Sequence, residues 1–299
     1  MAMKRIGIYG IVIIFGLLGC EKESDWEGGT SNTEGLKRVS IQMAIEEGAS
    51  FEKYIHSLAV FAFQETDDSF VYYKKVADLT AGDIHNLESG MASVANSKML
   101  KMTLPAGLYR FYYLANDLSN EYVEPPRGGS VEQGYLPFPP VGVEQAYFMG
   151  EVEMKPGADE STPLFVVLSR VVSRLTVVIT GIPDQVDSVR YRVEGISSRV
   201  LLTEATAGDT TSYTGIYSRD IPASADTVIS RLLLFPGSGA KIGFQFFAGT
   251  GVVKEKTIPV SGLVPNNDVF ISGRWEETGT TRLFRIFSTP FYNSFHSGD

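Results

Sequence analysis

The feature that most constrains this chain is a repeated pattern of short β-branched and aromatic runs between Val39 and Trp275, each bounded by Gly, Pro, Asp or Asn. This pattern is typical of antiparallel β-sandwiches, and no regular alternation of strand and helix interrupts it. In Leu58–Gln64 both faces are apolar, which predicts a central strand covered on both sides. The one helix-like interval is Ala81–Ala95, with Thr80 and Asp83 spaced as a capping pair. We expect an all-β fold.

Two interruptions divide the strand pattern. Residues 122–142 are rich in Pro and Gly and predict a long surface loop, which either presents Tyr135 and Phe138 for binding or, as we favour, packs these rings on its own sandwich. The second interruption, Lys155–Pro163, precedes an apolar run over Leu164–Ile182 that we expect to form one long strand opening a second domain. The pattern therefore predicts two tandem antiparallel β-sandwich domains, followed by an apolar tail, with the boundaries 38–160, 161–280 and 281–299.

The N-terminal segment has the layout of an export signal. Lys4 and Arg5 precede the uncharged run Ile6–Leu18, which ends at Gly19 and Cys20. This ending resembles the bacterial lipoprotein box, in which the chain is cleaved between a small residue, here Gly19, and a cysteine, here Cys20. The cysteine carries the lipid and becomes the new N-terminus. Cys20 is the only cysteine of the chain. The alternative is that Cys20 is an incidental apolar residue of a signal peptide or membrane anchor.

This layout predicts three consecutive segments. Residues 1–19 form a signal peptide that is removed, and Cys20 carries the lipid that tethers the protein to a membrane without a spanning helix. Residues 20–37 are mostly acidic or small and have Trp26 as their main apolar residue, so they form a flexible spacer. An acidic run directly after the cysteine resembles the surface-export signal of Bacteroidota lipoproteins and implies an outward-facing position on the outer membrane.

Composition excludes several classes of function. The chain has 26 basic and 35 acidic residues, for a formal charge of −9, so we expect no nucleic acid partner. Three histidines and one cysteine leave too few ligands for a structural zinc site, and His56 and His85 have no evident partner in the sequence. Adjacent carboxylates such as Glu46 and Glu47 would point to opposite faces of a strand. No motif of a hydrolase, metalloprotease or P-loop protein is present. We expect no enzyme, no cofactor and no metal.

The segment Asn116–Glu121 (NDLSNE) offers clustered oxygens for Ca²⁺. Its spacing departs from the EF-hand order, and a solvated turn is the interpretation that we favour.

Two longer segments carry a resemblance to a known family. They are Leu104–Asn116 (LPAGLYRFYYLAN) and residues 168–183 (LSRVVSRLTVVITGIP). Together with the lipoprotein box, the acidic spacer and the two strand blocks, they resemble the fimbrillin-associated anchor family of Bacteroidales, lipoproteins at the base of type V fimbriae. The resemblance implies two transthyretin-like β-sandwiches, outer-membrane attachment through Cys20, and a fimbrial subunit as partner. In these families stalk subunits lose a leading strand to an arginine-specific protease, and a neighbour's C-terminal strand fills the groove.

A lipidated base subunit cannot lose its leading segment, because a cut at Lys37-Arg38 would separate the body from its lipid. We therefore expect the neighbour to be bound by another surface, the apolar tail. The alternative is that the tail folds back on its own sheet edge, and Pro290 limits a donated strand to about Arg282–Ser288. The candidate partner-binding residues are Leu283, Phe284, Arg285, Ile286 and Phe287.

A second class of function is a surface glycan-binding lipoprotein, which would also have tandem β-sandwiches. Glycan sites use exposed aromatic rings as platforms, Trp above all, and the chain has only Trp26 and Trp275. Tyrosines are the remaining candidates for such a platform: Tyr112, Tyr113, Tyr135 and Tyr147. A third possibility, a scaffold for another surface complex, is not distinguished from the anchor by the sequence.

Overall fold

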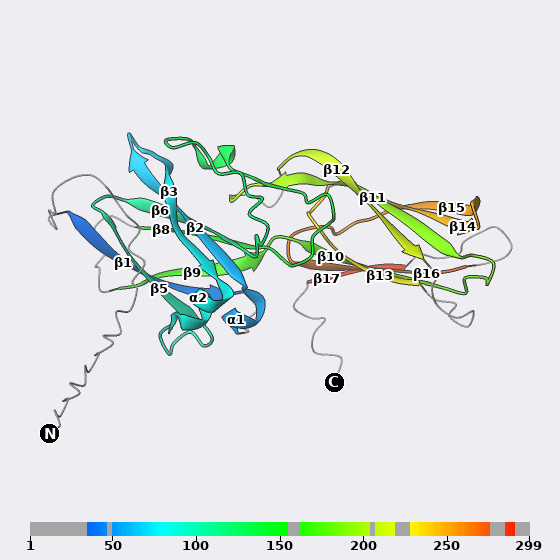
Figure 1. The fold of residues 1–299 in the computed structure, drawn as a ribbon, viewed down its shortest axis with the longest axis horizontal. Coiled ribbons are helices and arrows are strands. Elements are labelled where there is room, and N and C mark those ends of the chain that lie inside the picture. Colours follow the sequence, from blue (N-terminus) through cyan, green and yellow to red (C-terminus); the bar gives the residue numbers. More distant parts are fainter. Residues whose placement is uncertain are drawn as a thin grey trace, which may run out of the picture. The chain divides into compact units, whose positions relative to one another are not determined.

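The computed structural model describes residues 35–46, 50–154, 162–203, 207–218, 228–275 and 285–290, and the chain from Leu36 onward is one compact unit (Figure 1). Strands make up most of the described residues, so the predicted all-β fold is confirmed. Most strand pairs are antiparallel, as expected, whereas β1 with β9 and β10 with β16 are parallel. Among the described residues helices are few: α1 (Phe51–Tyr54), α2 (Ala81–Asn86) and the 3-10 turn η1 (Val131–Gln133).

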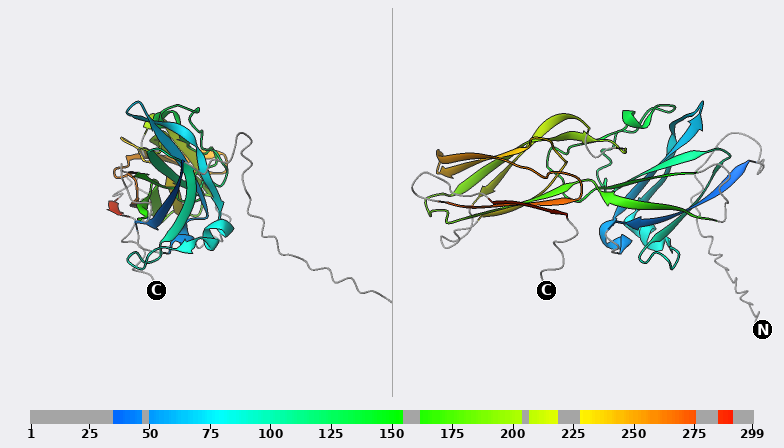
Figure 2. Two further views of the ribbon diagram at one scale, coloured as in Figure 1. Left: turned by 90° about the vertical axis from the view of Figure 1, so that its left-hand side faces the viewer. Right: turned by 180° about the vertical axis from the view of Figure 1, so that it is seen from behind.

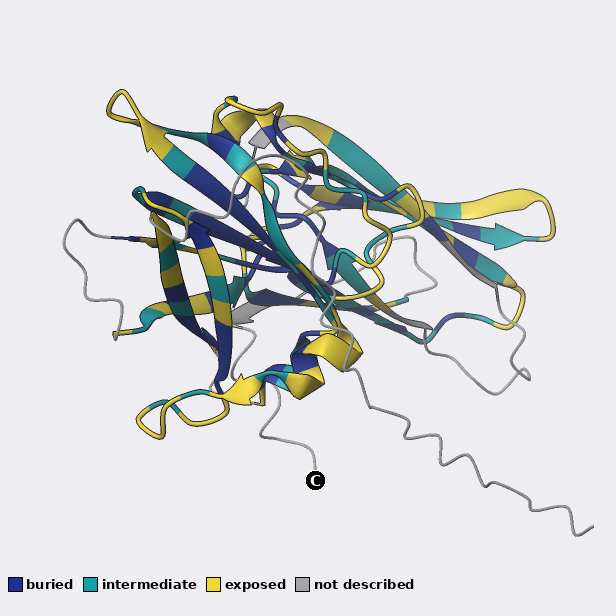
Figure 3. Ribbon diagram, turned by 60° about the vertical axis from the view of Figure 1, so that its left-hand side comes forward, coloured by how far each residue is buried: buried dark blue, intermediate teal, exposed yellow. Residues whose placement is uncertain are grey.

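The first sheet has eight strands in the order β3-β2-β6-β8-β9-β1-β5-β4. Its main core contains apolar side chains from β1, β2, β5, β6, β8 and β9, so the sheet curls around these residues. Figure 3 shows buried and exposed residues alternating along several strands, the period of two expected where one face is covered. The strands are β1 (Leu36–Ile45), β2 (Ser57–Thr66), β3 (Ser69–Thr80), β4 (Glu88–Ser89), β5 (Lys98–Pro105), β6 (Tyr109–Ala115), β8 (Phe148–Glu153) and β9 (Leu164–Arg170).

β2 is the central strand predicted from its apolar pattern. It pairs with β3 on one side and with β6 on the other. Successive residues that point to opposite faces, such as Val60 and Phe61, are both at most 1% exposed. One face packs into the main core and the other into a further cluster that contains Phe61 and Phe63. The prediction of a strand covered on both sides is therefore confirmed.

The remaining strands form two facing sheets, which Figure 1 and, from behind, Figure 2 show as separate layers. One has the order β13-β10-β16-β17 and the other β12-β11-β14-β15, with β7 (Leu136–Pro137) paired to the end of β11. A single core joins both layers, including Val177 of β10 and Phe244 of β14. The strands are β10 (Ser173–Thr180), β11 (Ser188–Val200), β12 (Ala207–Ser218), β13 (Val228–Leu234), β14 (Lys241–Ala248), β15 (Gly251–Pro259), β16 (Asn267–Arg274) and β17 (Arg285–Pro290).

The predicted single strand over Leu164–Ile182 is wrong, because this run contains two strands in different sheets. β9 pairs with β1 and β8, whereas β10 pairs with β13 and β16. Between them Val171 donates its N–H to Tyr147 O (3.0 Å), and Val172 O accepts from Asn266 N (3.1 Å). Both valines are buried, so the apolar run continues although the strand partners change. The domain boundaries at 38–160 and 161–280 stay predictions.

The helix near Ala81 is shorter than predicted, ending at Asn86. Its capping pair is confirmed: Thr80 Oγ1 accepts from the N–H of Asp83, and the Asp83 carboxylate accepts from the N–H of Thr80 (2.9 Å). Only Ile84 of the helix is buried, so little apolar surface supports a longer one. The longest helix in the described part of the chain has six residues, far below what a bilayer crossing requires.

Candidate functional site

The predicted site residues fall at the two ends of the chain. Gly19 and Cys20, and in the tail Leu283 and Phe284, lie outside the described residues. The remaining tail candidates, Arg285, Ile286 and Phe287, belong to β17. Their backbone partners on β16 are Ser272, Ile271 and Phe270, in antiparallel register. Within the described chain, the tail therefore pairs with its own sheet, which was the alternative left open by the sequence.

β17 is an edge strand of its sheet. β16 lies between β10 and β17, and no other described strand pairs with β17. An edge strand presents unpaired N–H and C=O groups along its outer side, which is the surface that β-strand addition uses. The C-terminal strand is thus placed where it can accept a neighbour's strand, or exchange with one, without disturbing the interior of the sandwich.

β1 occupies the opposite kind of position, in the interior of its sheet. It pairs with β5 from Leu36 to Met43 and with β9 from Ile41 to Ile45. Its core-facing residues Val39, Ile41 and Met43 are at most 5% exposed. The dibasic pair Lys37-Arg38 lies inside the ladder with β5. Removing β1 would open a groove through the sheet and expose its main core.

The Pro-rich loop over residues 122–142 packs on its own protein. Phe138 contacts the rings of Phe235 (centroids 5.3 Å apart) and Tyr213 (6.3 Å), and its N–H donates to Ser198 O (2.8 Å). Tyr135 forms backbone hydrogen bonds with Val123 and lies under the guanidinium of Arg199. The interpretation that we favoured from the sequence, a stiff crossover that packs its rings on the sandwich, agrees with these contacts.

Most tyrosines considered as a glycan platform are unsuitable, because Tyr112, Tyr113 and Tyr147 are at most 8% exposed. Both faces of β6 are covered, because Tyr113 belongs to the main core and Tyr112 to the cluster that contains Phe61 and Phe63. Trp275 also packs inward, with its ring 4.9 Å from that of Phe246 and Lys254 Nζ 4.2 Å from its centroid.

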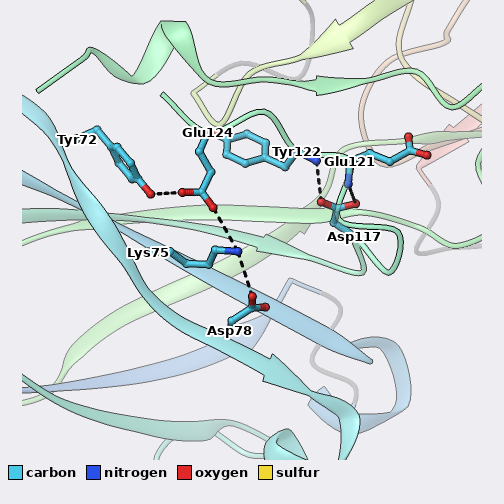
Figure 4. Close-up of polar contacts among 7 residues, drawn as sticks. All are labelled: Tyr72, Lys75, Asp78, Asp117, Glu121, Tyr122 and Glu124. Carbon is cyan, nitrogen blue, oxygen red and sulfur yellow. Dashed lines mark hydrogen bonds and ion pairs between the residues drawn. The ribbon is translucent and has the colours of Figure 1, made fainter. Parts of the chain in front are cut away.

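A polar network links β3 to the start of the Pro-rich loop (Figure 4). Lys75 lies between the carboxylates of Glu124 (3.2 Å) and Asp78 (3.0 Å), and the Tyr72 hydroxyl donates to Glu124. Burial, followed by the hydrogen bond to Glu124, raises the pKa of Tyr72. Burial lowers the pKa of Lys75, but hydrogen bonds to both carboxylates outweigh this effect and raise it. The network fixes the loop to the edge of the first sheet.

The segment considered for Ca²⁺ is a structural turn. Asp117 uses its carboxylate oxygens to accept the N–H groups of Glu121 (3.0 Å) and Tyr122 (2.9 Å) (Figure 4). A cavity of about 380 Å³ lies beside it, lined by residues that include Asp78, Asp117 and Glu124. Among the residues that the structure describes, no group of three His, Cys, Asp or Glu side chains is arranged to hold a metal ion.

This chain is similar to one protein family and to several solved structures. The family described as fimbrillin-A associated anchor proteins Mfa1 and Mfa2 matches residues 31–268. The solved fimbrial anchor protein Mfa2 from Porphyromonas gingivalis is 13% identical with a TM-score of 0.55, over 85% of this chain and 98% of that chain. No curated protein matches.

Two structures from Bacteroides thetaiotaomicron are also similar. A candidate adhesin is 14% identical with a TM-score of 0.57, over 86% of this chain and 97% of that chain. A candidate polysaccharide-binding protein is 12% identical with a TM-score of 0.59, over 84% of this chain and 95% of that chain. At these identities the likeness concerns the fold.

Proposed function

Because the chain belongs to the family of fimbrillin-A associated anchor proteins, we propose that it is an outer-membrane lipoprotein, tethered through Cys20, that holds the base of a fimbrium and binds a fimbrial subunit by β-strand addition. The family supports the coarser role, a fimbrial anchor or subunit at the cell surface. A binding role without catalysis is part of the proposal.

The observation that carries the proposal is the interior position of β1. A base subunit tethered by its N-terminus must keep the segment that connects its body to the lipid. β1 follows that segment directly, pairs with strands on both sides and covers the main core. Arg38 lies opposite Thr103 in the ladder with β5, so a protease needs this end of the strand to open before it can cut. These features favour a chain that keeps its first strand.

A replacement at the dibasic pair tests this requirement. Replacing both Lys37 and Arg38 by Gln removes the basic residues at which an arginine-specific protease would cut. We expect fimbriae to remain attached to cells, because attachment needs β1 in place. Loss of attachment in this double variant, with normal amounts of the protein in the membrane fraction, would show that cleavage is required and contradict the anchor proposal.

The subunit-binding surface is assigned to the edge formed by β17. Two truncations of the chain isolate it: removal of residues 281–299 deletes β17, whereas removal of 291–299 keeps it. We expect the longer deletion to release fimbriae into the medium and the shorter one to retain them. Circular dichroism and thermal unfolding check that both variants fold. Retention of fimbriae by a folded 281–299 deletion would exclude strand addition at this edge.

A further inference from the structure

The outer face of the sheet β12-β11-β14-β15 (Figure 1) carries a concavity of about 640 Å³ that the anchor role does not use. The strand register arranges its side chains in three rows across the sheet. In the first row Arg190 lies beside Gln245, which lies beside Glu255. In the second row Arg192, Gly243 and Thr257 are neighbours. The third row pairs Glu194 with Lys241. We call these three rows the polar concavity.

Gly243 accounts for the hollow in the middle row. It is the position at which a side chain would otherwise project between Arg192 and Thr257. A Cβ placed there meets only Thr257 Oγ1 at 3.5 Å and Arg192 O at 4.0 Å, which are ordinary contacts. The space above Gly243 is therefore open, and the fold itself does not demand glycine at this position.

Most charges in the polar concavity are already paired. Glu194 binds Lys241 (2.9 Å) and Arg192 (3.0 Å), and the hydrogen bond from Lys241 holds the pKa of Glu194 below its ordinary value. Gln245 donates to Glu255 (2.7 Å). These contacts hold the side chains around the hollow in defined positions.

Arg190 differs from the other cations of the polar concavity. Its guanidinium carbon lies 5.2 Å from the ring centroid of Phe247, and no carboxylate in the described part of the chain pairs with it. Stacking on a ring leaves the N–H groups at the edge of the guanidinium available for a planar, bidentate partner. A guanidinium held in this way suits a carboxylate, whose two oxygens match its pair of N–H donors.

We propose that the polar concavity binds a short stretch of an acidic polysaccharide, with a sugar carboxylate on Arg190 and sugar hydroxyls on Gln245, Glu255 and Thr257. Its volume lies in the range of about 300–1,000 Å³ typical of small-molecule sites. Gln245, Glu255 and Thr257 suit sugar hydroxyls. The amide oxygen and the carboxylate accept hydrogen bonds from hydroxyl groups, and the threonine hydroxyl can both donate and accept. A peptide is disfavoured because the strands under the concavity are already paired with one another and offer it no main-chain ladder.

Calorimetry with the full chain tests the proposal, with an oligogalacturonate as probe. We expect saturable binding that is lost with the methyl-esterified oligogalacturonate, which lacks the carboxylates, and absent with hexaglutamate. Arg190→Gln should weaken binding about tenfold or more, the effect expected for losing a charged hydrogen-bond pair. Arg199→Gln is the matched control, because Arg199 lies on the same strand and stacks on Tyr135 at 5.3 Å. It should leave binding unchanged.

A second pair of variants tests the hollow without removing charge. Gly243→Leu fills the open space and should abolish binding, whereas Gly251→Leu at the far end of β15, where a Cβ meets only Ala248 O at 3.6 Å, should not. Three results would overturn the proposal: no binding of oligogalacturonate, equal binding of hexaglutamate, or unchanged binding in a folded Gly243→Leu variant. None of these results depends on fimbrial attachment.

Discussion

Asn116 shows how one residue can hold three segments together. It follows β6 with a φ of 68° and is 4% exposed. Its side-chain oxygen accepts the N–H of His56, and its amide group donates to the carbonyls of Tyr54 and Ala146, each at 2.8 Å. Asn116→Ala removes all three bonds and places alanine in the left-handed region, so we expect a loss of about 3–4 kcal/mol in the free energy of unfolding. Urea denaturation measures it.

Asn120 provides the control for backbone strain. It has a φ of 51°, is exposed, and makes no side-chain hydrogen bond within the described chain. Asn120→Ala should therefore cost only about 1 kcal/mol. Equal losses in the two variants would mean that the three hydrogen bonds of Asn116 contribute nothing.

Glu52 makes the stability of the first sheet depend on pH. Hydrogen bonds from Lys98, and then from His85 (3.0 Å), hold the pKa of the Glu52 carboxyl below its ordinary value of 4.5. A carboxyl with a lowered pKa in the folded state stabilises it above the unfolded-state pKa, and this contribution is lost as the pH falls. We expect the urea concentration at the unfolding midpoint to fall as the pH is lowered below about 4.5. In Glu52→Gln this fall should be smaller. Glu65→Gln, at an exposed position, should leave the change of the urea midpoint with pH as it is in the unmodified chain.

The pairing of His85 with Glu52 was missed by the sequence analysis, which found no evident partner for this histidine. The two residues are 33 positions apart, on α2 and α1, and Lys98 of β5 completes the group. No local spacing signals such a contact, because it depends on how the two short helices pack against each other and on the reach of the Lys98 side chain.

At the scale of elements, Phe235 connects the sheets. It follows β13, is 0% exposed, and packs against Phe138 of the loop and Tyr147 before β8 (centroids 5.3 and 6.0 Å apart). The cluster that contains it includes residues from strands of the first sheet and from β11. Phe235→Ala should lower the free energy of unfolding by about 3–5 kcal/mol because it leaves a cavity. Calorimetry measures the loss.

Phe165 is the matched control for Phe235, since it is 47% exposed on β9. Phe165→Ala should change stability by less than about 1 kcal/mol. A similar loss in both variants would show that the buried cluster is no more important for stability than a surface ring.

Elements were predictable where the signal is local. The central position of β2 and the Thr80–Asp83 capping pair follow from side-chain periodicity and from spacing within one turn. The break between β9 and β10 does not, because Val171 and Val172 continue the apolar run. Their backbone bonds go to Tyr147 and Asn266, which are remote in the sequence.

At the scale of the whole molecule, the proposed lipid on Cys20 is the feature that would hold the protein on a membrane. Cys20→Ser removes the only thiol of the chain and therefore the proposed site of lipid attachment. We expect the variant to leave the membrane fraction and to lose labelling by a fatty-acid probe, because acyl chains supply about 0.8 kcal/mol per buried methylene group. Trp26→Ala, in the same segment, should keep both. A Cys20→Ser variant that remains in the membrane fraction would exclude the lipid tether.

The sequence by itself determined the all-β class and the family, and it predicted the lipid tether. Alternation, turn residues and short motifs are local properties, so they can be read without knowing which strands meet. Only the tertiary structure decided that β1 lies inside its sheet, that β17 lies at an edge, and that Arg190, Gly243 and Glu255 share one face. Strand order depends on which apolar faces bury one another across long separations, and this choice is made by the whole core rather than by any one segment.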